Sequence, residues 1–461
     1  FQAEDGIRDL VRSRGLGDVY KRQAMDRERD IGRVVLQPDT VLDFARFRGP
    51  DLEADLRARD FTINAMAVDS LALEASPDGA IKIAPQAIVD PCAGMADMQA
   101  RRLDLTHARA IADDPIRALR AVRLCWQLNL EMSPRTADAA RESAPQLLET
   151  SAERVRDEFV KLLRGPAPHH AIRQMADLGL TDIILPEIAA LRDVQQSAPH
   201  HEPVLAHTLS VLARLLQCEA ALTAEHAQDA TGAQLAALLQ PYARDLLDHL
   251  QRPVDGMLDG RTLLRFGALF HDVGKAQTAS VEENGRIRFL GHDKEGAPIA
   301  ARRLRALRLS NEAVLHVRDI VAAHMRPLHL TNAAKDGNGN TLSRRAVYRY
   351  FRATGSAGLD VALLSLADHL ATYNGPGPAQ QWRAMTSVVE RLLSHYFEQY
   401  EETVAPPPLL HGGELIAALD LKPGPKIGRL LRLIEEAQAA GDIHTKEQAI
   451  DLARQSLDTE D

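Results

Sequence analysis

Histidine and aspartate side chains in the second half of the chain have the types that suit a metal centre. The pair His271-Asp272 ends the apolar run of residues 263–270. Such a pair within an apolar helix is costly to bury unless it is hydrogen-bonded or bound to a metal. A single histidine is more often a satisfied core residue, so both interpretations stay open at this point. Further candidate ligands stand on both sides of the pair: His207, His292, His324 and Asp368.

A second group of polar side chains stands where the sequence predicts that a helix begins. Pro115 suits the first turn of a helix, and the two aspartates before it suit the N-terminal cap and the helix dipole. Arg117, Arg120 and Arg123 then recur every three residues on one face, and Asp114 lies on the same side. A guanidinium fork beside a carboxylate is what reading the Watson–Crick edge of a base requires. The alternative is a capped helix with a solvated basic face.

Three other segments accompany this helix: residues 51–67 and 90–103 before it, and 153–159 after it. In this order and at these separations, the four segments resemble class II tRNA nucleotidyltransferases, the family of CCA-adding enzymes and bacterial poly(A) polymerases. The resemblance covers the chain from about Asp26 to its C-terminus. It implies a Mg²⁺-dependent enzyme that binds tRNA, CTP and ATP and adds CMP and AMP to the 3′ end of tRNA.

The resemblance also implies roles for individual side chains. One acid and one arginine would form the protein template that selects C and then A, and two further arginines would lie toward the phosphates. Another arginine would contact the triphosphate, which its planar fork suits, between an aspartate and an asparagine that shape the pocket. Asp114 and Arg117 would form the template, and Arg120 and Arg123 would lie toward the phosphates. Arg59 would contact the triphosphate, between Asp60 and Asn64.

Two segments are assigned to support. Residues 90–102 read as a turn with Gly94 at its sharp point, which scaffolds the head without direct chemistry. Arg154 and Glu158 stand four residues apart and could clamp successive helical turns. They either brace the base-reading helix or form a solvated ion pair.

Residues 1–23 do not fit the resemblance, and we expect them to be translated sequencing-adapter sequence outside the fold. If that segment replaced the true start, the chain lacks the glycine turn and the Asp-x-Asp strand that hold Mg²⁺ in the family. Residues 33–36 and 41–47 read as two short strands joined by a turn at 37–40. Asp43 is either a third carboxylate of the Mg²⁺ site or an acid that flanks the turn.

The second half of the chain resembles an HD domain, whose pattern is a histidine, then His-Asp, then a distant aspartate. Imidazole and carboxylate ligands without thiolate favour Mn²⁺, Mg²⁺, Ni²⁺ or Fe²⁺ over structural zinc. A bound metal would acidify a water for attack on a phosphoester, with Asp272 and Lys275 as catalytic residues. Lys275 could hold the substrate phosphate or merely be exposed. The matching ligands are His207, His271, Asp272 and Asp368, with His292 and His324 at positions that make some HD sites binuclear.

The C-terminal segment follows a proline-rich linker at residues 405–408. A Gly-Pro turn at 424–425 begins a helix and leaves backbone N–H groups open to a phosphate. The resemblance favours contact with the RNA backbone, and the alternative is a surface hairpin with solvated charges. The basic side chains near the turn are Lys422, Lys426, Arg429 and Arg432.

Length and composition bound the architecture. A chain of 461 residues, 45% of them hydrophobic, is expected to form several domains with full-size cores. We predict an α+β fold in which a partial nucleotidyltransferase head with a small mixed or antiparallel sheet precedes helical domains. After residues 1–23, the expected parts are the head (24–112), the neck (113–190), the HD phosphohydrolase domain (191–380) and the RNA-binding segment (381–461).

Charge and cysteine usage indicate the environment. A net charge of −9 argues against a basic coat over the whole surface but leaves room for a local basic stripe that binds RNA. Cys92, Cys125 and Cys218 stand far apart, which suits reduced thiols rather than a disulfide frame or a zinc cage. No apolar run approaches the length of a transmembrane helix, and no signal peptide opens the chain. We therefore expect a cytoplasmic protein with no membrane contact.

The sequence thus predicts a tRNA nucleotidyltransferase of the CCA-adding type with an HD phosphohydrolase domain. Without its head carboxylates, the chain would act only as a phosphohydrolase on nucleotide or RNA phosphoesters. The motifs also do not separate CCA addition from A-addition or poly(A) synthesis. A non-enzymatic RNA-binding remnant is the remaining alternative, and the intact His–Asp set argues against it.

Overall fold

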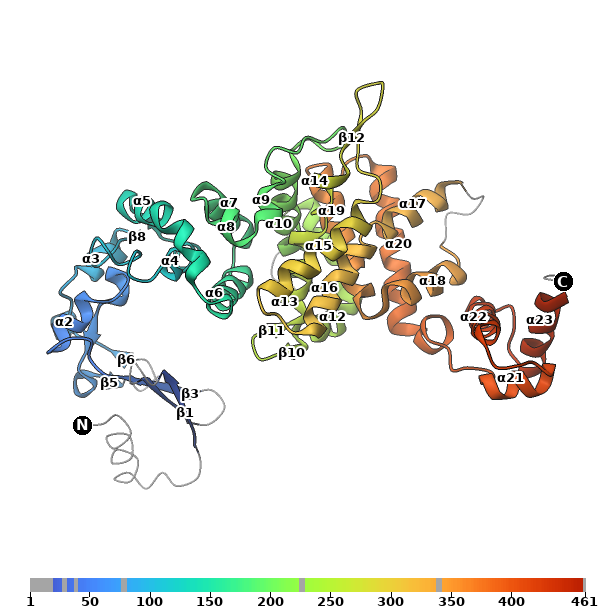
Figure 1. Ribbon diagram of the computed structural model, residues 1–461, viewed down its shortest axis with the longest axis horizontal. Helices are drawn as coiled ribbons and strands as arrows, with labels where there is room; N and C mark the ends of the chain where they lie inside the picture. The colour runs from blue at the N-terminus through green and yellow to red at the C-terminus, as the bar shows by residue number, and fades with distance from the viewer. Residues whose placement is uncertain are drawn as a thin grey trace. The chain divides into compact units, whose positions relative to one another are not determined.

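The fold was examined in a computed structural model that describes residues 20–26, 31–36, 40–75, 81–223, 229–336 and 342–458. These residues divide into two units, one within Phe1–Arg117 and Leu130–Ala139, the other within Ala118–Asn129 and Ala140–Asp461. Short strands and short helices build the first unit, and long helices dominate the second (Figure 1). The predicted α+β class is confirmed.

The head begins with an antiparallel sheet in the order β1-β2-β3 (Tyr20–Asp26, Ile31–Leu36, Thr40–Ala45). Strands β2 and β3 match the two strands predicted from their apolar residues, while the predicted turn lies largely outside the described residues. Strand β1 includes residues 20–23, which we had placed outside the fold. Asp43 lies within β3 opposite Arg33, with an exposed side chain, and does not flank the turn.

Short elements continue the head. Helix α3 packs beside β8, which pairs in parallel with β9, the strand that follows α4 in the chain. The bounds are α2 Leu52–Arg57, η1 Thr62–Asn64, β4 Ala67–Val68, η2 Ser70–Ala72, β5 Glu74–Ala75, β6 Ile81–Lys82, η3 Pro85–Ala87, β7 Ile88–Val89, α3 Gly94–Gln99, β8 Arg102–Leu103 and β9 Glu131–Met132.

The segment around Gly94 has the predicted scaffolding character. Asp90 accepts hydrogen bonds from the backbone N–H groups of Gly94 and Met95, at 2.7 and 2.9 Å. The sharp point lies one residue earlier than predicted, because Ala93 has the left-handed backbone with φ of 60°. Gly94 is needed for a different reason: a Cβ there would lie 2.2 Å from the Thr62 carbonyl oxygen. The glycine therefore permits close packing of α3 on the segment that contains Thr62.

The neck is helical, as predicted, and its first helix starts at Ile116, directly after Pro115. The division between the two units falls within this helix, α4. Breaks between its helices occur near Pro134 and at Gly165. The helices are α4 Ile116–Leu128, α5 Pro134–Ser143, η4 Ala144–Glu149, α6 Ala152–Arg164, α7 Pro168–Asp177, α8 Leu180–Ile184 and α9 Pro186–Ala189.

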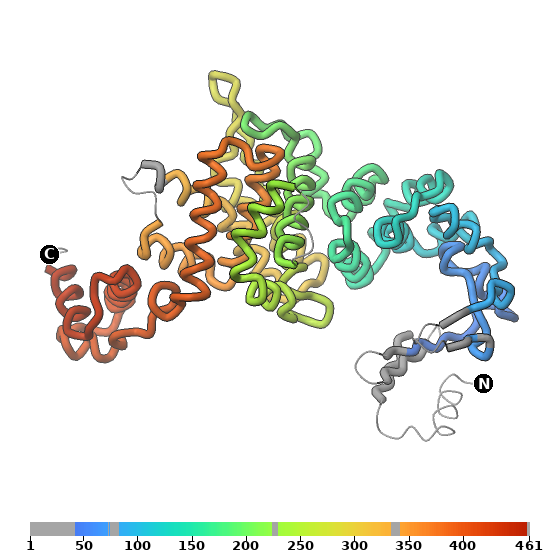
Figure 2. The backbone as a smooth tube through the Cα atoms, turned by 180° about the vertical axis from the view of Figure 1, so that it is seen from behind, coloured from blue at the N-terminus to red at the C-terminus, as the bar shows by residue number. Residues whose placement is uncertain are grey.

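The body of the second unit is a bundle of long helices around α13 (Figures 1 and 2). Ten of the eleven residues of α13 are buried, all but Arg261, as expected for a central helix. Gly267 lets α16 approach closely, since a Cβ there would lie 2.5 Å from Ile320 Cγ2. The principal helices are α10 Val204–Leu222, α13 Gly260–Phe270, α15 His292–Ala306, α16 Asn311–Ala323, α19 Gly358–Thr372 and α20 Ala379–Glu398.

Smaller elements surround this bundle, including the β12–β13 hairpin that projects from it in Figure 1. Their bounds are α11 Ala230–Leu239, η5 Gln240–Tyr242, α12 Ala243–Gln251, β10 Pro253–Asp255, β11 Leu258–Asp259, α14 Lys275–Thr278, β12 Ser280–Val281, β13 Ile287–Arg288, α17 Arg326–Asp336, α18 Arg344–Thr354, η6 Gly355–Ala357 and the π-helix η7 Tyr400–Val404.

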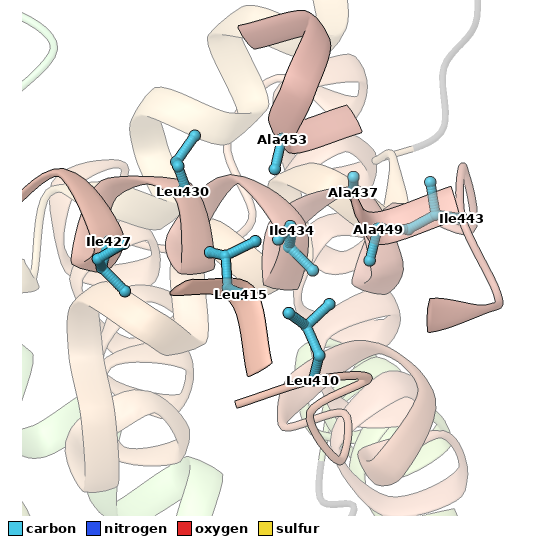
Figure 3. Close-up of a cluster of buried hydrophobic side chains, with 9 residues drawn as sticks. All are labelled: Leu410, Leu415, Ile427, Leu430, Ile434, Ala437, Ile443, Ala449 and Ala453. Atoms are coloured by element: carbon cyan, nitrogen blue, oxygen red, sulfur yellow. The ribbon is translucent and has the colours of Figure 1, made fainter. Parts of the chain in front are cut away.

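The C-terminal segment has its own apolar cluster (Figure 3). It consists of α21 (Gly412–Leu419), α22 (Pro425–Ala440) and α23 (Lys446–Asp458). Buried residues of α22 fall at Ile427, Leu430, Ile434 and Ala437, the spacing of an amphipathic helix. This arrangement leaves the opposite face of α22 to polar and basic side chains.

Candidate metal centre and nucleotide site

The six predicted HD ligands come from helix ends that converge in the second unit. His271 and Asp272 directly follow α13, and His292 is the first residue of α15. The turn after Asp272 packs closely on α15, because a Cβ on Gly274 would lie 2.1 Å from the His292 carbonyl oxygen. Of the other three ligands, His207 lies early in α10, His324 directly after α16 and Asp368 late in α19.

Asp272 stands at the middle of this cluster, and its two oxygens face different histidines. Its Oδ2 lies 3.1 Å from His271 Nε2 and 3.7 Å from His207 Nε2. Its Oδ1 lies 3.3 Å from His292 Nε2 and 3.8 Å from His324 Nε2. The donor atoms thus form two triads that share Asp272, each with all its atoms within 4.8 Å of one another.

Asp368 completes the cluster from α19. Its Oδ1 lies 3.0 Å from His207 Nε2, and its side chain is 27% exposed toward a cavity. Burial would raise the pKa of this carboxyl, but the hydrogen bond and charge of His207 hold the pKa below its usual range. The structure therefore brings all six predicted ligands together.

Hydrogen bonds orient three of the imidazoles toward the cluster. The Nδ1 atoms of His271, His292 and His324 donate to backbone carbonyl oxygens at 2.7–2.8 Å. In a neutral imidazole the other nitrogen then carries no proton and presents a lone pair. The Nε2 atoms of His292 and His324 face each other at 3.1 Å, and buried His271 Nε2 faces Asp272 Oδ2 at the same distance. Lone pairs converging on a buried point fit a divalent cation.

The charges of the cluster suit the same ion. Burial would raise the pKa of Asp272, but the charges of His271 and Lys275 outweigh it and hold the pKa well below its usual range. Burial lowers the pKa of His324 to about 4. At neutral pH the carboxylate is therefore ionised and this imidazole is neutral, which are the forms that bind metals.

Lys275 is buried, with 5% of its surface exposed. Its Nζ lies 2.7 Å from Asp272 Oδ2 and donates to Gln196 Oε1 at 2.7 Å. It also lies 5.3 Å from the centre of the Phe289 ring. The alternative that Lys275 is merely exposed is wrong, and its contact with a substrate phosphate stays a prediction.

A cavity of about 390 Å³ opens over the cluster and is lined by Asp272, His292, His324 and Asp368. Three other lining residues were missed by sequence reasoning: Gln196, His200 and Arg286. The His200 ring packs edge-on against the His207 ring at 4.9 Å, and burial lowers its pKa to about 4. These residues lie on connecting segments. The only signals in the sequence were a histidine pair after Pro199 and a basic hairpin.

In the head, the structure brings Arg59, Asp60 and Asn64 together. Buried Asp60 accepts from Asn64 Nδ2 at 3.1 Å and from the Phe61 N–H at 2.9 Å. Arg59 is half exposed and donates to Asp55 Oδ2 at 3.0–3.2 Å and to the Asn64 carbonyl at 3.3 Å. These three residues form a hydrogen-bonded group, and its contact with a nucleotide stays a prediction.

Asp114 and Arg117 adjoin as predicted at the start of α4. Arg117 Nε lies 4.0 Å from Asp114 Oδ2, and Arg117 Nη1 donates to the Ala110 carbonyl at 2.9 Å. Arg117 is 9% exposed. A donor fork and an acceptor are thus held side by side in fixed orientation.

Glu158 of α6 braces α4, as one of the two interpretations predicted. Arg123 Nε donates to its Oε2 at 2.8 Å, and Arg120 Nε lies 3.5 Å from its Oε1. Burial would raise the pKa of Glu158, but the charges of Arg123, Arg120 and Lys161 lower it. Since both arginines serve this brace, their predicted approach to nucleotide phosphates stays a prediction, as does the pair of Glu158 with Arg154.

The C-terminal basic residues lie where the sequence placed them. Helix α22 begins at Pro425, directly after Gly424. Lys422, Arg429 and Arg432 are exposed, and Lys426 is half-buried. Their contact with RNA stays a prediction. None of the helices in the described ranges is long and apolar enough to cross a membrane.

Four family models match successive parts of the chain. They are the poly A polymerase head domain (residues 18–104), the "probable RNA and SrmB-binding site of polymerase A" (129–191), the HD domain (204–373) and tRNA nucleotidyltransferase domain 2 (296–453). The first match includes residues 18–23, which sequence reasoning had set aside. The HD match includes all six predicted ligands.

Relatives extend over most of the chain. The A-adding tRNA nucleotidyltransferase of Deinococcus radiodurans is 33% identical over 87% of this chain and 78% of its own length. The CC-adding tRNA nucleotidyltransferase of Thermus thermophilus is 31% identical over 92% of this chain and 82% of its own. A solved CCA-adding enzyme in complex with CTP shares the fold, with a TM-score of 0.58 at 17% identity over 99% of this chain and 85% of its own.

This chain belongs to the class II tRNA nucleotidyltransferase family, the CCA-adding enzymes, and carries an HD domain. Both kinds of domain are metal-dependent.

Proposed function

We propose that the chain adds CMP, AMP or both to the 3′ end of tRNA, using CTP and ATP. The observation that carries this proposal is the 33% identity to an A-adding relative over 87% of the chain. The Asp114–Arg117 pair supports it, because a carboxylate and a guanidinium held side by side can read the edge of C or A without a nucleic-acid template. Arg59 is the residue suited to the triphosphate.

The head does not supply a complete Mg²⁺ site in the part of the chain that the structure describes. No two aspartates in the sequence are separated by a single residue, and both metal-ligating clusters lie in the HD domain. We therefore assign Mg²⁺ to the transfer reaction without naming its ligands. Among the described residues of the head, Asp43, exposed on β3, is the carboxylate that we propose for this site.

The test is incorporation of labelled CTP and ATP into tRNA that lacks its CCA end, with Mg²⁺. We expect ordered addition of C, A or both, and Arg117→Ala should lose the choice between CTP and ATP while sparing phosphohydrolysis. A run of A residues would identify a poly(A) polymerase. No incorporation would overturn transfer by this chain and leave phosphohydrolysis as its activity.

The second candidate function, phosphohydrolysis at the HD domain, is favoured by the cluster of six converging ligands. His207, His271 and Asp368 would hold a divalent ion on one side of Asp272, and His292 and His324 on the other. The ion, Mn²⁺, Mg²⁺, Ni²⁺ or Fe²⁺, would acidify a water and offset phosphate charge. Lys275 fixes the orientation of Asp272, and the cavity of about 390 Å³ admits a nucleotide-sized phosphoester.

Hydrolysis of a nucleotide phosphoester, measured with each of the four ions, tests this assignment. Asp272→Ala should abolish hydrolysis and leave nucleotide addition intact, which is the reciprocal of Arg117→Ala. If both substitutions reduced both reactions equally, the division into two sites would be wrong.

The exposed basic residues of α22 and the turn before it are the proposed contacts with the tRNA backbone. Replacing Lys422 and Arg429 by glutamate should weaken tRNA binding and flatten its dependence on salt concentration, because phosphate contacts release counterions. Unchanged binding and salt dependence would assign these residues to an ordinary solvated surface.

A further inference from the structure

Helices α16 and α19 carry a second buried His–Asp group, apart from the metal cluster. His316 Nε2 of α16 lies 2.8 Å from Asp360 Oδ2 of α19. His249 of α12 brings its Nε2 to 3.1 Å from the same oxygen. Asp360 is fully buried, and 5% of His316 is exposed. Three helices thus meet at one carboxylate oxygen.

This group is built for hydrogen bonding rather than for a metal. Both imidazoles direct Nε2 at one carboxylate oxygen, so each Nε2 carries a proton and donates it. The other nitrogen of His316 lies 3.3 Å from Ser356 Oγ, whose hydroxyl can donate to it. Burial would raise the pKa of Asp360, but His249 and His316 lower it to about 2, so the carboxylate is ionised. Among the described residues, no metal-ligating cluster includes these three side chains.

The group lies on the same two helices as two of the metal ligands. His324 follows His316 by eight residues, and Asp368 follows Asp360 by eight. Eight residues of helix span about 12 Å, and a slip of one residue turns a side chain by about 100°. A hydrogen bond that fixes His316 against Asp360 therefore fixes where His324 and Asp368 point.

We propose that Asp360, with His316 and His249, is a positioning group that sets the register of α16 against α19 and so holds His324 and Asp368 at the metal centre. The proposal rests on the assignment of metal binding to the HD cluster. None of the three residues touches the substrate cavity or the ligands in the described contacts. They act through the two helices.

The test is Mn²⁺ affinity, measured by calorimetry on the full chain and accompanied by thermal unfolding. Asp360→Asn removes the charge at constant shape and should weaken Mn²⁺ binding about tenfold or more, the size found for residues that orient metal ligands. The matched control is Leu364→Ala, a buried position of α19 midway between Asp360 and Asp368. It should lower the unfolding temperature but keep Mn²⁺ affinity.

A conservative substitution separates positioning from general stability. His316→Gln keeps an N–H donor toward Asp360 and should keep Mn²⁺ affinity, whereas His316→Leu should lose it. If Asp360→Asn did not fold, His249→Leu at the edge of the group should give the same order of affinities.

Other outcomes are equally decisive. If affinity fell in proportion to unfolding temperature in all variants, Leu364→Ala included, the group would have a structural role only and the proposal would be overturned. If the unsubstituted chain bound no Mn²⁺ and none of the other three ions, the HD assignment itself would fail.

Discussion

Two buried His–Asp groups share helices α16 and α19, and they differ in which imidazole nitrogen is engaged. At Asp272, three histidines donate from Nδ1 to backbone carbonyls and turn their Nε2 atoms inward. At Asp360, two histidines turn Nε2 to the carboxylate and donate from it. The first arrangement points several ring nitrogens at one another around a buried carboxylate, and the second points two ring nitrogens at one oxygen, Asp360 Oδ2, while Asp360 Oδ1 has no hydrogen-bond partner.

The difference shows that burial and residue type do not identify a metal ligand. His316 lies in α16 and His324 directly follows that helix, and both are 5% exposed, yet only His324 directs its Nε2 into the cluster. What separates them is the partner of the other ring nitrogen, a carbonyl for His324 and a hydroxyl for His316. The hydrogen bond that the other ring nitrogen makes therefore decides whether a histidine can act as a metal ligand.

The largest expected effect is on metal-dependent stability. An ion at 100 times its dissociation constant should stabilise the unsubstituted chain by about 2.7 kcal/mol, because it binds only the folded state. Asp272→Asn should abolish this gain together with hydrolysis, since it removes the carboxylate that both triads share. Urea unfolding with and without Mn²⁺ measures the effect. An undiminished gain in the variant would remove Asp272 from the centre of the site.

A second expected effect is on the pH dependence of the metal-free chain. The pKa of His324 is lowered to about 4 from 6.5, so its contribution is complete above pH 6.5 and is lost as the pH falls through 4. The pKa of Asp360 is lowered to about 2 from 3.8. Its contribution, about 2 kcal/mol, is complete above pH 3.8 and is lost as the pH falls toward 2.

The contribution of His324 should therefore be lost to acid before that of Asp360. Urea unfolding in the presence of a chelator, from pH 7 to pH 2, checks the order. His324→Leu should flatten the stability profile between pH 6.5 and 4, and Asp360→Asn should flatten it below pH 4. If Asp360→Asn flattened the profile between pH 6.5 and 4, and His324→Leu flattened it below pH 4, the hydrogen-bond pattern described above would be contradicted.

Much of the metal centre could be predicted because its residues are marked locally. His271-Asp272 ends an apolar helix, where an unpaired polar pair is costly, and the other ligands follow a known order. The start of α4 at Ile116 and of α22 at Pro425 could be predicted from proline and capping residues alone. Sequence predicts these helix starts because the residues adjacent in sequence determine where a helix begins.

The remaining contacts could not be predicted, because they join residues distant in sequence. Lys275 meets Gln196 across 79 positions, and Asp360 meets His249 across 111. No periodicity or spacing marks such pairs, since only the packing of whole helices brings them together. Glu158 could be singled out from the sequence, but its partners Arg120 and Arg123 come from another helix, and no local pattern predicts these two ion pairs. Partner choice belongs to packing rather than to local sequence.

The smallest expected effect gives the sharpest comparison, because the two histidines that it compares, His316 and His324, are eight residues apart and equally buried. In the metal-free chain, His316→Leu should destabilise by about 1.5 kcal/mol, because a hydrogen bond to the buried charge of Asp360 is lost. His324→Leu should change stability by less than about 1 kcal/mol, because only a bond to the Val321 carbonyl is lost. Added Mn²⁺ should then stabilise the first variant weakly and the second not at all. Equal losses without metal would mean that both histidines are ordinary core residues, and the distinction drawn from their ring nitrogens would fall.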